Sequence, residues 1–486
     1  MQIPMNKLYL NKENRNALLG LLFLLLIQAA LVFWHVQQEV HEIDYWKAKT
    51  LRVGYLPSEK VHAELSPYGP GFEKELVELF CQKHGLTPQW IKMQNFGQGI
   101  EGLDKGLLHL FLAGPGLEGL EKAGIVKGPY YLKSRMIVVH NQGRYPLNSL
   151  HDLCSTDLVI PDRPPYRQKL DSLENLLECM LEPVKTTEPG QPFFRTLSDR
   201  RFRFGLMDEL SFKLWKGLYP EVRKTYAFEG NRQHRWLWSG RQQDLHENLE
   251  VFWEQVIQSG KLAELSEKYY GFFPANQDPY QLRHFVRVLH EDVPRYTSTI
   301  LDAAEKYRLD PLLLVALIYQ ESHFDPQASS RTGVRGLLQL TMQTAAFLGV
   351  ENRLDPHESI LGGAKYLSIL LESVEEMGIE SWDRWFFALA AYNQGLGHVY
   401  DARTLAERQG LNPDSWSGLK QAYPLLSYRK YYEDLPRGYA RGFEAVQFVE
   451  NVRFYYYLLY GLLSLARPEV EHLGSFLDFV PPDWPE

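Results

Sequence analysis

The sequence predicts a multidomain protein in which an α/β domain precedes a mainly α-helical domain, with one apolar helix ahead of both. Three observations lead to this prediction. The chain has 486 residues and is 45% hydrophobic, which is enough for two or three domains with proper cores. Strand patterns alternate with helix patterns up to about residue 272, and helix patterns dominate after it. A charge-free run of 18 residues, 17–34, precedes both regions.

The charge-free run is long enough to cross a bilayer. Lys7, Lys12 and Arg15 stand in front of it and should stay on the cytoplasmic side. A cleaved signal peptide is the competing interpretation, although Ala29 and Ala30 make a poor cleavage site. Residues 1–40 are therefore expected to be a signal-anchor or a signal peptide, and the rest of the chain is expected to be exported.

Charge and cysteine content bound the possible functions. A net charge of −8 and a pI near 6.0 argue against a general nucleic-acid binder, because phosphate contacts require a basic surface. The histidines and cysteines form no metal-ligand pattern, so no metal or other cofactor is expected. Outside the cytoplasm Cys154 and Cys179 could form a disulfide; three separate buried thiols, including Cys81, are an equal alternative.

Residues 41–272 carry the α/β pattern. An amphipathic run at 71–80 predicts a helix, and a helical stretch at 245–271, broken at Gly260, closes the region. Short apolar runs predict strands at residues 51–55, 107–112, 136–140, 158–160 and 202–207.

This order resembles the type 3 extracellular solute-binding family, the amino-acid receptors of periplasmic transport. The opening strand, the Ala113-Gly114 turn, the Pro129-Tyr130-Tyr131 block and the closing helix carry the resemblance. It places the family's ligand-gripping arginine at Leu120, which cannot bind a carboxylate in a bidentate manner. Lys122 and Asp208 are left as a possible ligand cleft. The domain is expected either to bind a ligand such as a cell-wall peptide or to serve as a spacer or interaction domain.

Residues 273–295 are the expected linker, because Pro274, Pro279 and nearby turn formers interrupt the pattern. A linking helix is expected near 282–289. A helix at 296–307 then opens the second domain, expected at 296–486.

The most informative stretch of the second domain begins at Asp310. Asp310 is a good N-cap, and Pro311 suits the first helical position. Apolar residues at three- and four-residue spacing predict one buried helical face, and the helix ends near Glu321. A carboxyl group at a helix C-terminus beside apolar residues should have a raised pKa, as a general acid requires.

Three further blocks follow in order. They are Gly336-Leu337-Leu338-Gln339-Leu340, Gly362-Gly363-Ala364-Lys365-Tyr366-Leu367 and Ala391-Tyr392-Asn393-Gln394-Gly395. With Glu321 and Ser322 they resemble the catalytic domain of the soluble lytic transglycosylase family, a goose-type-lysozyme-like fold, over about residues 297–460. Leu338 stands where the family has Met.

The resemblance implies cleavage of the β-1,4 bond between N-acetylmuramic acid and N-acetylglucosamine in peptidoglycan, with a 1,6-anhydro product. Glu321 would act first as acid and then as base, and the sugar would supply its own nucleophiles. This fits the sequence, because no second acid in these blocks is placed for the two-carboxylate chemistry of ordinary glycosidases. Asp325 is expected to order a loop.

Each remaining site residue has a functional and a structural interpretation. Ser322 is expected near the acid and the substrate, or else bonded to a helix carbonyl. Gln339 is expected to contact a sugar amide, or else the loop backbone. Tyr392 and Asn393 are expected to line the groove, with a buried tyrosine and a capping asparagine as the alternative.

A late tyrosine of the family falls on Phe448, which has no hydroxyl, so either its role is absent or Tyr439 provides it. For Arg437 and Arg441, each taken alone, a solvated surface position is the favoured interpretation, and contact with stem-peptide carboxylates is the alternative.

Two other functions remain open at this point: a hydrolytic lysozyme on the same fold, and a non-catalytic sensor of peptidoglycan or muropeptides. The expected location is the periplasmic side of a Gram-negative envelope. The resemblance implies peripheral association with the outer membrane, whereas residues 17–34 alone indicate an inner-membrane anchor.

Overall fold

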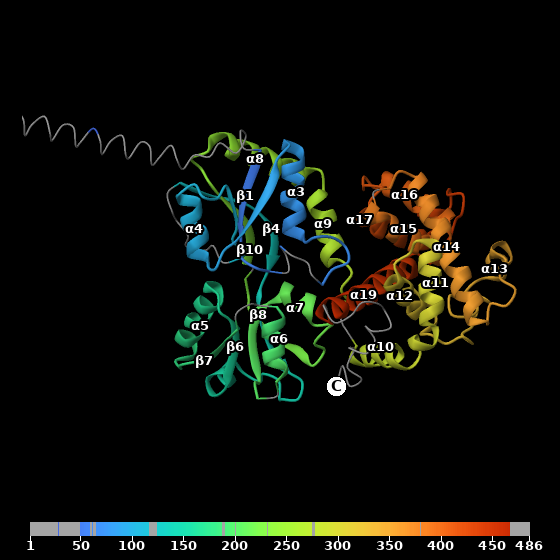
Figure 1. Cartoon of the computed structure of the whole chain (residues 1–486), viewed down its shortest axis with the longest axis horizontal. Coiled ribbons are helices and arrows are strands. Elements are labelled where there is room, and N and C mark those ends of the chain that lie inside the picture. The colour runs from blue at the N-terminus through green and yellow to red at the C-terminus, as the bar shows by residue number, and fades with distance from the viewer. Residues whose placement is uncertain are drawn as a thin grey trace, which may run out of the picture.

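The computed structural model shows an α/β half and a helical half lying side by side (Figure 1). The structure describes residue 28 and residues 49–466, apart from 59–60, 62–64, 116–123, 187–189, 200, 231, 275–277 and 380. The apolar run expected to be a membrane segment therefore lies, except for residue 28, outside the described residues. Within the described part of the chain, no helix has the length and apolar character needed to cross a membrane.

The α/β half contains two five-stranded sheets, ordered β2-β1-β3-β10-β4 and β7-β6-β8-β5-β9. The first sheet consists of β1 (Thr50–Tyr55), β2 (Thr87–Lys92), β3 (Leu110–Leu112), β4 (Ile125–Ser134) and β10 (Arg232–Ser239). The second consists of β5 (Met136–Asn141), β6 (Asp157–Pro161), β7 (Glu182–Thr186), β8 (Phe204–Asp208) and β9 (Val222–Ala227).

The chain passes between the two sheets twice, from β4 to β5 and from β9 to β10. The first sheet is thus completed by β10, which runs antiparallel to β3 and β4. Two lobes joined by two connections are the arrangement of a solute-binding-protein-like domain, as the sequence predicted. Its helices are α3 (Phe72–His84), α4 (Phe96–Asp104), α5 (Pro164–Leu177), α6 (Gln191–Ser198), α7 (Glu209–Trp215), α8 (Gln243–Gln258) and α9 (Lys261–Tyr270), with a 3-10 helix η1 at Leu150–Ser155.

The strand predicted at 136–140 is present as β5, and the Pro129-Tyr130-Tyr131 block precedes it. The block itself lies inside β4, a strand that was not predicted from the sequence. Pro129 is tolerated there because β4 lies at the edge of its sheet and, among the described strands, pairs with β10 alone, with register shifts along the pair.

The cysteine alternatives are resolved in favour of the bridge. Cys154 and Cys179 form a disulfide with a Cα–Cα distance of 6.0 Å, which ties η1 to the end of α5. Cys81 is a buried free thiol.

The helical half begins after α10 (Pro279–Glu291), where the sequence predicted a linking helix. Its elements are η2 (Val293–Tyr296), α11 (Thr297–Tyr307), α12 (Pro311–Ser322), α13 (Met342–Leu348), α14 (Pro356–Glu376), α15 (Ser381–Gln394), α16 (Leu396–Arg408), α17 (Trp416–Ala422), η3 (Tyr423–Ser427), α18 (Arg429–Tyr432) and α19 (Gly442–Ala466). Helix α12 differs from the expectation of one apolar face, because every residue from Leu312 to Tyr319 is buried. It is a central helix, and α11 and α19 pack against it.

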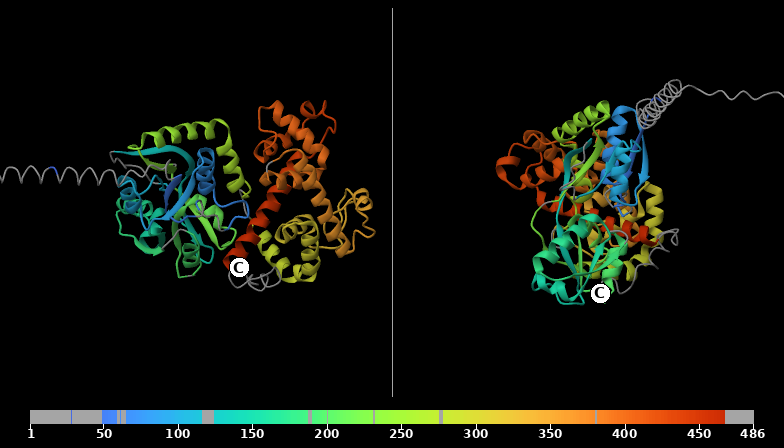
Figure 2. Two further views of the ribbon diagram at one scale, coloured as in Figure 1. Left: turned by 45° about the horizontal axis from the view of Figure 1, so that its top comes forward. Right: turned by 90° about the vertical axis from the view of Figure 1, so that its left-hand side faces the viewer.

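Helix α19 runs from the helical half towards the α/β half (Figures 1 and 2). Arg453 of α19 is 1% exposed and pairs with Glu267 of α9 at 2.9 Å and with Glu450 at 3.0 Å. Tyr68 donates a hydrogen bond to the Arg453 carbonyl, and Tyr457 donates one to the Leu214 carbonyl. One hydrophobic core therefore continues from one half into the other.

Candidate active site

Helix α12 fixes the position of Glu321. The Asp310 side chain accepts hydrogen bonds from the backbone N–H groups of Leu312 and Leu313, and Tyr456 donates to its other oxygen at 2.7 Å. The helix ends one residue after Glu321, at Ser322, because His323 adopts a left-handed conformation with φ 51°. The anchored start and sharp end hold Glu321 at the edge of the buried helix.

Glu321 faces a cavity of about 650 Å³. No hydrogen bond or ion pair from another described residue reaches its carboxyl group. Burial raises the pKa of Glu321 from 4.5 to about 8. The raised pKa agrees with the sequence-based expectation, and the structural cause is loss of hydration without a compensating partner.

The loop opposite Glu321 is built on Gly336. Its φ is 81°, and a Cβ added there would lie 1.8 Å from the carbonyl oxygen of Arg353. Only glycine allows the backbone to pass this close. The backbone therefore makes a close approach at Gly336. At Gly333, φ is 85° but a Cβ would meet nothing within 4 Å.

Gln339 follows in the same loop with φ 44°, an uncommon conformation for a non-glycine residue. Its amide nitrogen donates to the carbonyls of Gly336 at 2.8 Å and Ala328 at 3.1 Å. The backbone bonding considered from the sequence is therefore present. Because both amide hydrogens are used, the amide oxygen is the end left to accept a hydrogen bond in the cavity that Gln339 lines.

The other two sequence blocks support this loop. Helix α14 passes Leu338 so closely that a Cβ on Gly363 would lie 2.4 Å from the Leu338 side chain. Tyr392 of α15 donates a hydrogen bond to the Leu338 carbonyl at 2.8 Å. Burial, and next the nearby Glu321, raise the pKa of Tyr392. Tyr392 thus holds the loop while it forms part of the cavity wall.

The structure brings together Glu321, Gln339, Tyr392 and Asn393 around one cavity. It does not bring Ser322 or Tyr439 to it. Ser322 is buried and donates to the Ile318 carbonyl of its own helix at 3.2 Å. Tyr439 is 56% exposed and packs edge-on against Tyr432.

Several wall residues were not singled out from the sequence. Tyr366 packs against Tyr392 with ring centroids 5.3 Å apart. The sequence feature that could have indicated Tyr366 is its position four residues after Gly362 on the same helix. The cavity wall also includes Ser330, Arg331, Thr332, Thr341, Gln343, Thr344, Arg441 and Glu444. Arg441 had been considered only as a possible contact for stem peptides.

Two other acids near the cavity are committed to local contacts. Glu444 lies 3.0 Å from Arg441 in an ion pair between half-exposed side chains. Asp325 accepts a hydrogen bond from the backbone of Gln327, so it orders the loop as expected. Among the described residues, Glu321 is the acid at this cavity that keeps its proton near neutral pH.

The α/β half has its own cleft between the two sheets. It is nearly closed, with about 50 Å³ of space, and Arg163 of one lobe donates to the Pro57 carbonyl of the other. Asp208 lies in its wall and caps α7 by accepting hydrogen bonds from Leu210 and Ser211. Lys122, the other predicted cleft residue, lies outside the described residues.

These features define a class of protein: a two-lobed α/β domain joined to a helical domain with one protonated acid in an open groove, as in enzymes that cleave glycans.

Comparison with known proteins agrees with this class. The Transglycosylase SLT domain family matches residues 298–413. Membrane-bound lytic murein transglycosylase F of Shewanella halifaxensis is 34% identical over 84% of this chain and 85% of the relative. The protein of that name from Photobacterium profundum is 34% identical over 85% of this chain and 80% of the relative.

The chain belongs to the membrane-bound lytic murein transglycosylase F family. Among solved structures, an ancestral arginine-binding protein bound to arginine aligns at 18% identity with a TM-score of 0.40, covering 46% of this chain and 99% of that one.

Proposed function

We propose that this protein cleaves the β-1,4 bond between N-acetylmuramic acid and N-acetylglucosamine in peptidoglycan and leaves a 1,6-anhydromuramoyl end. The observation that carries the proposal is Glu321, which keeps its proton in an open cavity and has no partner among the described residues. A protonated carboxyl group in such a place is a ready general acid.

The reaction then needs one acid and no water. Glu321 donates its proton to the glycosidic oxygen, and the bond from that oxygen to C1 of the muramic sugar breaks. The muramic acetamide stabilises the positive charge at C1. The Glu321 carboxylate next removes the proton of the C6 hydroxyl, and O6 bonds to C1. The acid ends in its starting form, and the net proton transfer is from O6 to the leaving oxygen.

We propose that the cavity wall positions the sugars. The Gln339 amide oxygen is placed to accept a hydrogen bond from a sugar amide, because its nitrogen is already fixed by two carbonyls. Asn393 supplies a polar group beside it, and Tyr392 forms the wall. No sugar contact is proposed for Ser322 or Tyr439.

The test is digestion of purified sacculi by the full-length protein, with muropeptides read by mass spectrometry. Products one water lighter than reducing-end muropeptides are expected, and Glu321→Gln should abolish them. Reducing-end products from the wild type would reject the anhydro reaction, and an absence of cleavage by the wild type would leave a binding role.

A hydrolytic reaction is the second candidate, because Glu444 also reaches the cavity and could activate a water. Glu444→Gln separates the two. Hydrolysis would be lost in this variant, whereas the anhydro-forming reaction should persist because Glu444 has no role in it.

We also propose that the protein works on the periplasmic side of the envelope, held there by residues 1–40. The Cys154–Cys179 bridge supports an oxidising compartment. The location can be tested with a cysteine introduced at the exposed residue Lys185. A thiol reagent that cannot cross membranes should label this cysteine in intact cells only if the domain is outside the cytoplasm.

For the α/β cleft we propose a cell-wall peptide as ligand. Asp208 and Glu73 lie in its wall with Arg163 and Arg232, so groups of both signs are available for an amine and a carboxylate. The cleft must open to admit it, since only about 50 Å³ is free. Calorimetric titration of the full chain with a stem peptide tests this, and lack of binding would favour a spacer role.

A further inference from the structure

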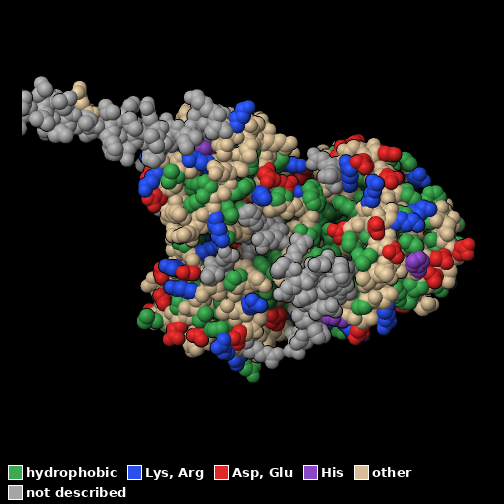
Figure 3. All heavy atoms as spheres, viewed as in Figure 1, with side chains coloured by type: hydrophobic (Ala, Val, Ile, Leu, Met, Phe, Trp, Pro, Cys, Tyr) green, Lys and Arg blue, Asp and Glu red, His purple; other side chains and the backbone are tan. Residues whose placement is uncertain are grey.

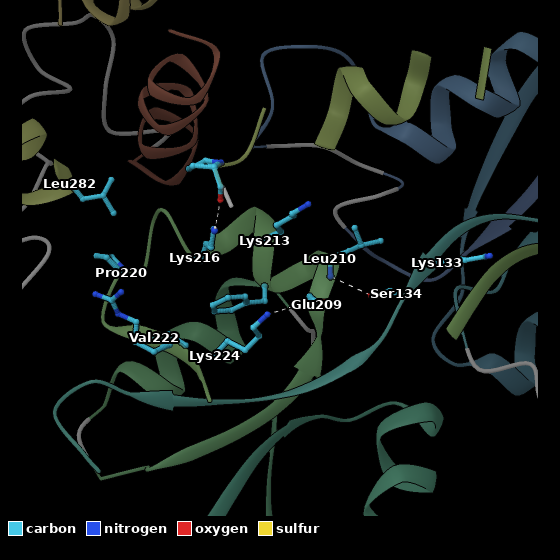
Figure 4. A pocket seen from close by; sticks show the side chains of 13 residues that line it. Lys133, Ser134, Glu209, Leu210, Lys213, Lys216, Pro220, Val222, Lys224 and Leu282 are labelled. Atoms are coloured by element: carbon cyan, nitrogen blue, oxygen red, sulfur yellow. Dashed lines mark hydrogen bonds and ion pairs between the residues drawn. The ribbon is translucent and has the colours of Figure 1, made fainter. Parts of the chain in front are cut away.

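A second cavity, of about 530 Å³, lies on the α/β half and is lined by a different set of residues from the cleft between the lobes. Its floor is formed by α7 and β9, and Pro274 and Leu282, from the segment leading into the helical half, complete its wall (Figure 4). A cavity of this size accommodates a small molecule or a headgroup.

The wall of this cavity carries a concentration of positive charge. Lys133, Lys213, Lys216, Arg223 and Lys224 line it, with Glu209 as the one acid among the lining residues that the structure describes. This contrasts with a chain of net charge −8, whose acidic and basic side chains are interspersed on the face drawn in Figure 3.

Glu209 balances only part of this positive charge. Its carboxylate is shared between Arg135 at 2.6 Å and Lys224 at 2.9 Å. Lys216 donates to the Pro274 carbonyl at 3.1 Å, which leaves its charge uncompensated. Lys213 makes no hydrogen bond or ion pair with the described residues.

The cations are close enough to repel one another. Burial first, and then Lys213, Lys224 and Arg223 in that order, lower the pKa of Lys216 to about 8, while Glu209 acts in the opposite direction. Burial, and then Arg283 of α10, lower the pKa of Arg223, with Asp278 acting in the opposite direction. A like-charged cluster facing one cavity costs free energy unless an anion joins it.

The residue types indicate the kind of anion. Planar carboxylates are matched by the forked guanidinium of arginine, whereas ammonium groups act as point charges that suit the oxygens of a phosphate. Lysines supply four of the five cations, and Figure 4 shows Lys213, Lys216 and Lys224 around the same space. We propose that this cavity binds a phosphate group, either on a small molecule or on a lipid headgroup.

The test is calorimetric titration of the full-length protein, in uncharged detergent, with inorganic pyrophosphate. Saturable one-to-one binding that weakens with added salt is expected. Lys213→Glu should weaken it at least about tenfold, because it replaces a charge-assisted contact with repulsion. The matched control is Lys185→Glu, the same charge change at an exposed position of β7 in the same lobe, which should leave the affinity unchanged.

Further arms identify the source of the phosphate. Vesicles of phosphatidic acid in phosphatidylcholine that compete with pyrophosphate would assign a lipid headgroup, and competition by glycerol phosphate alone would assign a soluble ligand. Citrate binding as tightly as pyrophosphate would overturn the preference for phosphate. No saturable binding, or equal loss in Lys213→Glu and Lys185→Glu, would overturn the site.

Sacculus digestion by Lys213→Glu distinguishes this proposal from the enzymatic one. Normal cleavage with lost pyrophosphate binding is expected, because Lys213 lies outside the Glu321 cavity.

Discussion

The helical domain and the α/β domain use carboxyl groups in opposite ways. In the helical domain, Glu321 borders a cavity of about 650 Å³ and receives no hydrogen bond from a described residue. In the α/β domain, the cleft holds about 50 Å³, Asp208 caps a helix, and Glu73 accepts a hydrogen bond from Tyr131. The difference shows that the surroundings, rather than the residue type, decide whether an acid can exchange its proton with a substrate.

The largest expected effect is on catalysis. Glu321→Gln keeps the shape of the side chain but removes the proton, so the initial rate of muropeptide release should fall by about 10²–10⁴-fold. Quantified sacculus digestion measures it. Retention of more than about a tenth of the activity would mean that Glu321, like the acids of the α/β cleft, does not donate a proton to a substrate.

The second effect is on stability as a function of pH. The folded protein holds the Glu321 proton up to a pH of about 8, whereas an unperturbed glutamate has a pKa of 4.5. Between these values unfolding releases a proton, so this residue lowers the free energy of unfolding by about 1.4 kcal/mol per pH unit as the pH rises. The free energy of unfolding of Glu321→Gln should thus equal that of the wild type near about pH 4 and exceed it by up to a few kcal/mol near about pH 8.

Denaturant unfolding at several pH values measures this difference, and Glu444→Gln is the matched control because Glu444 is half-exposed and ion-paired. Parallel curves for Glu321→Gln and the wild type would show that the Glu321 carboxyl is hydrated after all.

A third, smaller effect concerns the loop that faces Glu321. Gly336→Ala should lower the free energy of unfolding by at least about 2 kcal/mol, since its Cβ collides with the Arg353 carbonyl in a left-handed conformation. Gly333→Ala shares the left-handed conformation without the collision, so about 1 kcal/mol is expected. Chemical denaturation of both variants compares them, and equal losses would contradict the close approach.

The smallest effect is expected in the α/β cleft. Asp208→Ala removes the cap of α7 and should cost about 1 kcal/mol, whereas Asp208→Asn retains a capping oxygen and should cost less than about half of that. Urea unfolding of the two variants checks the ranking. If Asn cost as much as Ala, capping would not be what the carboxylate does here.

Many features of the two domains could be predicted from the sequence, because the patterns that indicate them are local. Asp310-Pro311 marks a helix start, and the ordered blocks around Gln339 and Asn393 carry family information. The raised pKa of Glu321 followed from its place at a helix end among apolar residues.

What the sequence could not supply depends on contacts between distant segments. The partners of Gln339 are carbonyls fixed by a turn, and Ser322 faces its own helix rather than the cavity. The Cys154–Cys179 bridge was one of two equal alternatives until η1 and α5 were placed. The basic cavity joins residues from β4, α7 and β9 that are about 90 positions apart at the extremes, from Lys133 to Lys224.

The burial of Arg453 has a consequence for the two domains. Its guanidinium is enclosed by Glu267 of one domain, Glu450 of the other, and the ring of Phe386 at 4.1 Å. Separating the domains would remove Glu267 from this buried charge and leave Glu450 as its remaining carboxylate, a costly step. A protease that cut the chain between Pro274 and Asp278 would therefore leave the two pieces migrating as one particle. The helical domain would stay bound to the α/β domain after the cut.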